Sequence, residues 1–186
     1  QSTLLLLKYA LKTNCKKFIY ASTMSVYGDQ PDIPITEEAS TLPKSFYAVG
    51  KLASEHYLDI YSQYSIDIVA LRLFNVYGPG QNMENLKQGM VSIFLAQALT
   101  NKKIIVKGSA ERYRDFVFID DVVRAFIQTG IYNDGKYRVF NIGTSERTTV
   151  SELIEKIKSN LQFDVKVEFN DPTIGDQFGI YANIDK

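Results

Sequence analysis

The chain has 186 residues, of which 45% are hydrophobic and 23% are charged, and its 21 basic side chains are balanced by 21 acidic ones. This composition is typical of a globular domain and excludes a disordered or low-complexity chain. The zero net charge provides no general attraction for nucleic acid or an anionic membrane, so neither is expected as a partner.

The rare residue types exclude further classes of site. A single cysteine, Cys15, excludes an internal disulfide and a cysteine-built zinc site, and a single histidine, His56, argues against a histidine-rich metal centre. No metal site is therefore expected. No apolar run approaches the roughly 18 residues that span a bilayer, and we expect a cytoplasmic protein.

Helical spacing and short apolar runs alternate along the chain. In chain order, the pattern predicts a helix over 2–13, a strand over 17–22, a long loop over 23–43, a helix over 46–63 and a strand over 66–74. After a break at 78–81, it predicts a helix over 89–100, a strand over 104–106, an extended piece over 116–118, a helix over 120–131, a strand over 139–142, a helix over 151–160 and a strand over 165–169. This alternation indicates an α/β fold with a doubly wound parallel sheet. The shorter later elements favour a smaller α/β substrate-binding lobe beside it.

The first helical stretch begins without a clear helix-start signal, and the chain opens on Gln1. We therefore expect a fragment of a longer protein. A complete chain whose first helix has no cap is the alternative.

Tyr47 and Lys51 lie four residues apart on a predicted helix, so their side chains share one face. A nearby cation favours the phenolate form of a tyrosine, and the pair can supply a general base for a substrate hydroxyl. The spacing also occurs at Tyr132 and Lys136, but a turn signal at 133–135 separates that pair. Context favours the first pair, because a strand that ends in Ser22 and Thr23 precedes it.

Several segments spread along nearly the whole chain form a combined pattern: Phe18–Thr23, Val26–Gly28, Tyr47–Lys51, Arg72–Gln81, Arg112–Val122, Asn141–Gly143 and Gly175–Asp176. Together, in this order, they resemble the extended short-chain dehydrogenase/reductase family, that is, the NAD-dependent nucleotide-sugar epimerases and dehydratases. The resemblance implies the C-terminal part of a Rossmann-like sheet. Residues 1–78 would belong to the dinucleotide-binding domain and 79–186 mostly to the substrate-binding lobe, with segments near 115–145 returning to the main sheet.

The resemblance also implies roles for individual residues. Thr23 would bond the sugar oxygen that is oxidised, Tyr47 would take its proton, and Lys51 would hold the nicotinamide ribose of NAD. Ser22 and Phe74 would also contribute to the cofactor site. The residues implied to contact a UDP-sugar are Thr23, Asn75, Val106, Arg114 and Asp176. The helices at 2–13 and 46–63 would form a homodimer contact.

The chain departs from the family pattern in three places. The glycine-rich dinucleotide turn is missing, Thr173 stands where an arginine is common, and Met24 and Ser25 stand where the 4,6-dehydratases carry an acidic pair. Without those carboxylates, water elimination lacks its acid and base. The resemblance therefore implies a nucleotide-sugar 4-epimerase of the UDP-glucose/UDP-galactose type.

Other functions remain open. A decarboxylase, dehydratase or reductase of the same family is one alternative, and a non-catalytic nucleotide-sugar binding module is another if the chain truly begins at Gln1. Purely structural roles are also open for the candidate site residues. Tyr47 and Lys51 could be a solvated helical pair, Thr23 a strand-end hydroxyl, Arg114 a partner in an ion pair with Asp115 or Asp120, and Asn75 a turn residue. Asp120 and Asp121 could cap a helix, and His56 could lie at the surface or in an interface.

Overall fold

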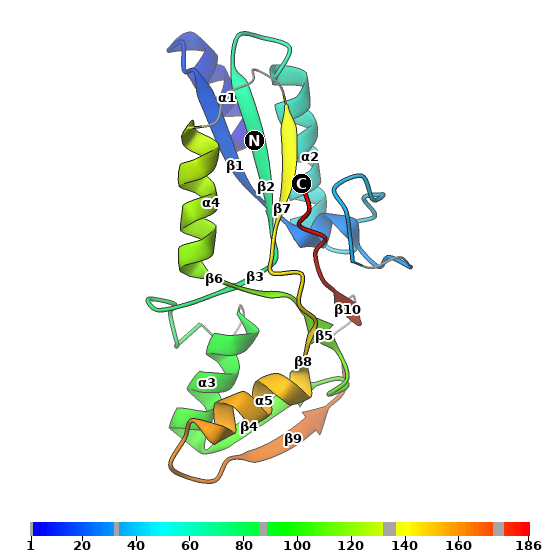
Figure 1. Cartoon of the computed structure of the whole chain (residues 1–186), viewed down its shortest axis with the longest axis vertical. Coiled ribbons are helices and arrows are strands. Elements are labelled where there is room, and N and C mark those ends of the chain that lie inside the picture. The colour runs from blue at the N-terminus through cyan, green and yellow to red at the C-terminus, as the bar shows by residue number, and fades with distance from the viewer. Residues whose placement is uncertain (1, 32–33, 86–88, 132–136, 173–176) are drawn as a thin grey trace.

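The computed structural model describes residues 2–31, 34–85, 89–131, 137–172 and 177–186. The chain forms two lobes that meet at a narrow junction (Figure 1). The first, here called the sheet lobe, contains strands β1 (Lys17–Thr23), β2 (Asp67–Leu73) and β7 (Arg138–Ile142) and helices α1 (Ser2–Lys12), α2 (Phe46–Tyr61) and α4 (Ile119–Ile131). The three strands are parallel and lie in the order β1-β2-β7.

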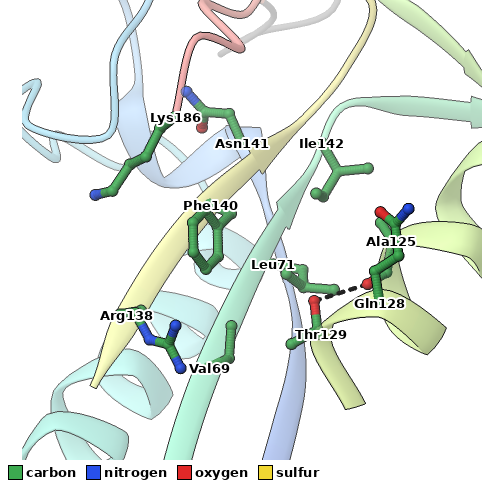
Figure 2. A pocket seen from close by; sticks show the side chains of 10 residues that line it. All are labelled: Val69, Leu71, Ala125, Gln128, Thr129, Arg138, Phe140, Asn141, Ile142 and Lys186. Atoms are coloured by element: carbon green, nitrogen blue, oxygen red, sulfur yellow. Dashed lines mark hydrogen bonds between the residues drawn. The ribbon is translucent and has the colours of Figure 1, made fainter. Parts of the chain in front are cut away.

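The central strand β2 is buried along almost its whole length, as expected for a parallel strand covered on both faces. Ile68 and Ala70 pack into a core with residues of α1 and α2. The alternate side chains Val69 and Leu71 point to the other face, toward α4 (Figure 2). At the start of β2, Asp67 lies 3.0 Å from the Lys17 ammonium of β1 and 3.4 Å from the guanidinium of the first residue of β7. This cluster aligns the amino ends of the three strands.

The second lobe, here called the small lobe, is built from α3 (Met90–Asn101), β4 (Lys103–Lys107), α5 (Val150–Ser159) and β9 (Lys166–Asn170). β4 and β9 form a parallel pair, and α3 and α5 pack beside them. A capping box starts α5, in which Thr149 and Glu152 satisfy each other's backbone N–H groups. The core of the lobe consists of Phe94, Ala98, Ile104, Val106, Val150, Leu153, Ile154, Ile157 and Val165.

Short strands occupy the junction between the lobes (Figure 1). β3 (Asn75–Tyr77) pairs in parallel with β6 (Phe116–Phe118), and β5 (Tyr113–Arg114) lies between β8 (Thr148–Thr149) and β10 (Gly179–Ile180). The sequence pattern did not predict β3, β5, β8 or β10, because two- or three-residue strands carry too little periodicity.

The α/β class and the parallel sheet predicted from the sequence are confirmed by this architecture. The loop expected over 23–43 begins instead with a 3-10 helix, η1 (Met24–Tyr27), capped by the Thr23 hydroxyl. The chain builds α3 and β4 of the small lobe between β3 and β6, returns to the sheet lobe with α4 and β7, and then adds α5 and β9 to the small lobe. None of the described helices is long and apolar enough to cross a membrane.

Candidate active site

Helix α2 presents the tyrosine–lysine pair near its amino end. Ser45 caps the helix by accepting a hydrogen bond of 3.2 Å from the backbone N–H of Ala48. Tyr47 follows in the first turn and is 53% exposed, so its phenol is open to a ligand. The Lys51 ammonium lies 5.7 Å from the centre of the Tyr47 ring and donates a hydrogen bond of 2.8 Å to the carbonyl oxygen of Ala21 in β1. The structure thus fixes the cation beside the phenol.

Thr23 and Ser22 lie at the carboxyl end of β1, beside α2. The Thr23 hydroxyl accepts from the N–H of Ser25 and donates to the Ser25 hydroxyl, each over 3.2 Å, so it caps η1. Ser22 is buried and donates its hydroxyl proton to the Glu55 carboxylate. Thr23 therefore has the structural role of a hydroxyl that caps the end of a strand, and the Ser22 hydroxyl bonds to a buried side chain of α2. The functional roles of both remain predictions.

Phe74 and Asn75 follow β2 and lie at the junction. Phe74 is buried in a core with η1 and Ile180, and its contribution to a cofactor site remains a prediction. The N–H of Asn75 donates to the carbonyl oxygen of Asp115 over 2.9 Å. Its side-chain oxygen Oδ1 is buried without a hydrogen-bond partner among the described residues. Such an atom is costly to leave unsatisfied, and it fits a group that completes its bonding with a ligand.

Arg114 and Val106 belong to the other side of the junction. Arg114 is buried, and its guanidinium donates to the carbonyl oxygens of Tyr113, Gln177 and Phe178. Burial, and to a lesser extent the charge of Arg112, lowers the pKa of Arg114 to about 10. Val106 is fully buried in the small-lobe core, where its side chain serves packing.

The structure gathers Thr23, Tyr47 and Lys51 at the end of β1 and places Asn75 and Arg114 in the junction strands. Asp176, Thr173 and the second pair, Tyr132 and Lys136, lie outside the described residues.

A buried polar network behind this site was not predicted. Glu55, one turn after Lys51 on α2, forms an ion pair of 2.7 Å with Arg72 of β2. The Arg72 guanidinium lies 4.7 Å from the ring centre of Tyr27, and the Tyr27 hydroxyl donates to Asn141 Oδ1 over 2.6 Å. The available signal was Arg72 within a mostly apolar strand, because a buried charge requires a partner.

A cavity of about 590 Å³ lies on the open face of the sheet lobe, between β7 and α4 (Figure 2). Its walls are mainly apolar, with Arg138 and Lys186 among them, and Thr23, Tyr47 and Lys51 do not line it. The cavity is therefore separate from the candidate active site.

Comparison with known proteins identifies relatives of the whole chain. A family model described as the NAD dependent epimerase/dehydratase family matches residues 1–143. The chain is 34% identical over 178 residues to dTDP-4-dehydro-6-deoxyglucose reductase of Escherichia coli, with 95% of this chain and 56% of the relative covered. It is 36% identical over 176 residues to UDP-glucose 4-epimerase of Mycolicibacterium smegmatis, with 94% and 56% covered.

A solved structure gives the same result at the level of the fold. UDP-glucuronic acid 4-epimerase from Bacillus cereus, in complex with UDP-glucuronic acid and NAD, superimposes with a TM-score of 0.89 at 29% identity, covering 98% of this chain and 57% of that one. The chain thus spans little more than half the length of these relatives. The family inferred from the sequence motifs is confirmed: the chain belongs to the NAD-dependent epimerase/dehydratase family.

Proposed function

We propose that the protein is a nucleotide-sugar 4-epimerase of the UDP-glucose/UDP-galactose type that uses NAD. The observation that carries this proposal is the placement of Tyr47 and Lys51 at the carboxyl end of β1, with the Lys51 ammonium 5.7 Å from the Tyr47 ring and held by a β1 carbonyl. Ligands of doubly wound sheets bind at this end of the strands.

Tyr47 acts as the general base. As a phenolate beside the Lys51 ammonium, Tyr47 takes the proton of the sugar 4-hydroxyl, while the Thr23 hydroxyl bonds the same oxygen. NAD, when bound, supplies the acceptor for the hydride from C4 and later its donor. After the 4-keto sugar has turned, Tyr47 returns the proton to the oxygen, and the epimer is formed without net oxidation.

The residues present fit such a cofactor. An ammonium has three N–H donors, and one of those of Lys51 goes to the Ala21 carbonyl. The others are left for ribose hydroxyls. Ser22 is buried and bonds to Glu55 of α2, and Phe74 is buried in a core with η1, so both would support the cofactor site from the protein interior.

For the substrate, Asn75 supplies a buried amide oxygen that needs a donor such as a sugar hydroxyl. Arg114 contributes positive charge near the same junction, which suits a diphosphate. Asp176 would complete the contacts with the nucleotide, and Val106, whose side chain is buried in the small-lobe core, would lie near the base without a side-chain contact to it.

The residues at positions 24 and 25 favour epimerisation over dehydration. Met24 is buried in a hydrophobic core, and Ser25 bonds to Thr23. No carboxylate therefore stands at either position to move the protons of water elimination.

The test is Tyr47→Phe in the natural protein, with conversion of UDP-glucose to UDP-galactose measured by product analysis. We expect turnover to fall by about 10²–10⁴-fold, with UDP-sugar affinity similar to that of the unaltered protein. Tyr57→Phe, on the same helix and 40% exposed, is the matched control and should retain activity. Unchanged turnover in Tyr47→Phe would exclude Tyr47 as the base. A change in redox state or release of CO₂ would indicate a reductase or a decarboxylase, and UDP-sugar binding without NAD would indicate a binding module.

A further inference from the structure

Asp115 is a fully buried carboxylate with an unusual set of partners. Its Oδ1 accepts hydrogen bonds of 2.8 Å from both the backbone N–H and the hydroxyl of Thr144. Its Oδ2 accepts bonds of 3.1 Å from the backbone N–H groups of Ser145 and Ala182. Four donors thus converge on one side chain, and bonds to an ionised acceptor are roughly twice as strong as neutral ones.

These partners come from different segments that cross the junction. Asp115 lies between β5 and β6, where the chain passes from the small lobe back to the sheet lobe (Figure 1). Thr144 and Ser145 follow β7 on the way to β8, and Ala182 follows β10. The carbonyl oxygen of Asp115 also accepts from the N–H of Asn75, the first residue of β3. Four crossing segments are therefore tied together at one residue.

Gly143 shows how tightly this crossing is packed. A Cβ atom at Gly143 would lie 2.6 Å from Asp115 Oδ2 and 2.9 Å from the Cβ of Ala182. Both distances are below normal van der Waals contact, so any side chain at 143 would displace the carboxylate. The Asp115 carboxylate therefore packs directly against the backbone at Gly143.

We propose that Asp115 is a positioning residue that holds the two lobes in register and thereby places Asn75 for the nucleotide sugar. Tyr47 and Lys51 belong to the sheet lobe, and Arg114 lies in the junction beside the small lobe. A substrate that reaches from one to the other requires a fixed spacing between them. This role rests on the proposed function, because it concerns the same site.

The main test is Asp115→Asn in the natural protein. In this variant the amide NH₂ would face groups that now donate hydrogen bonds to the carboxylate. At least one of those donors would lose its acceptor. We expect UDP, measured by titration calorimetry, to bind about tenfold more weakly, and KM for the UDP-sugar to rise with kcat largely retained. The amides of 144, 145 and 182 should exchange hydrogen faster, whereas those of β2 should not. Asp121→Asn, on the surface of α4, is the control.

A second pair of variants tests the same contact with a smaller change, in case Asp115→Asn does not fold. Thr144→Val removes one donor and leaves the backbone bonds in place, whereas Thr144→Ser retains the hydroxyl. We expect the valine variant to weaken UDP binding several-fold and the serine variant to restore it.

The outcomes separate the two proposals. Faster exchange at 144, 145 and 182 with unchanged UDP affinity and KM would overturn the positioning role. Unchanged exchange there would also overturn it. Failure of the unaltered protein to bind UDP would contradict the proposed function, and the exchange rates would still decide whether Asp115 ties the segments together.

Discussion

Tyr27 is a fully buried phenol in the 3-10 helix η1. Its hydroxyl donates to Asn141, and the Arg72 guanidinium lies against its ring. Burial raises the pKa of Tyr27 to about 12, and the charge of Arg72 offsets only part of this effect. The folded protein therefore keeps this proton more firmly than the unfolded chain does.

This raised pKa predicts a pH dependence of stability. A group whose pKa is higher in the folded state contributes stability that is fully present below its unfolded pKa of 10.0 and is lost as pH rises toward about 12. Two pKa units correspond to about 2–3 kcal/mol. We expect the free energy of unfolding to fall between pH 9 and pH 12, and to fall by about this amount more in the unaltered protein than in Tyr27→Phe. Urea unfolding of both proteins at the two pH values measures the difference. Tyr9→Phe, which alters a phenol that is 65% exposed, should behave as the unaltered protein does. Identical slopes for all three proteins would contradict the prediction.

At the scale of elements, α2 is fixed to the sheet by a buried charge pair. Glu55 and Arg72 are both buried, and Ser22 donates a further bond to the same carboxylate. Because Glu55 lies four residues after Lys51, this pair also determines where the tyrosine–lysine face sits above β1. The ion pair thus connects helix placement to the candidate active site.

Removal of one partner of this ion pair should lower the free energy of unfolding more than replacement of both partners by apolar residues. Glu55→Ala leaves the Arg72 charge buried without its partner, and we expect the free energy of unfolding to fall by about 3–5 kcal/mol. The double variant Glu55→Leu with Arg72→Met should lose much less than the sum of the two single changes. Denaturant unfolding measures both. Glu155→Gln, whose side chain on α5 is 68% exposed, serves as the control with a change of about 0.5 kcal/mol or less. Equal losses for Glu55→Ala and the control would contradict this role of the pair.

At the scale of the whole molecule, α1 and α2 contact each other on one side of the sheet lobe (Figure 1). Their outer faces expose large apolar side chains: Leu5, Leu6 and Tyr9 on α1, and Val49, Tyr57 and Ile60 on α2. Exposed apolar side chains that gather on a surface are typical of an interaction site, and the homodimer inferred from the resemblance remains a prediction.

An aspartate in this face should disrupt such a dimer, because the interface would bury an unpaired charge. We expect Leu6→Asp to convert a dimer into a monomer in light scattering, without a change in the circular dichroism spectrum. Leu99→Asp, at a position on α3 that is 52% exposed, should remain dimeric. A monomeric unaltered protein would refute the homodimer.

Local patterns account for much of what could be predicted. Apolar runs and helical spacing indicated the principal helices and strands, and the Tyr47–Lys51 spacing alone placed both side chains on one face of α2. Of the short strands of the junction, only β6 was expected; β3, β5, β8 and β10 escaped prediction, because pairing with distant segments, and not their own residues, makes them extended. The same holds for the 3-10 turn after Thr23.

The sequence by itself determined the family, the α/β order of elements and the tyrosine–lysine pair, because each depends on residues close together in the chain. Only the tertiary structure decided which distant groups meet. Arg72 reaches Glu55 on another element, Asp115 gathers Thr144 and Ala182, and Arg114 is surrounded by carbonyl oxygens. A buried polar group must be satisfied by whatever the fold brings beside it, and no local spacing specifies that neighbour.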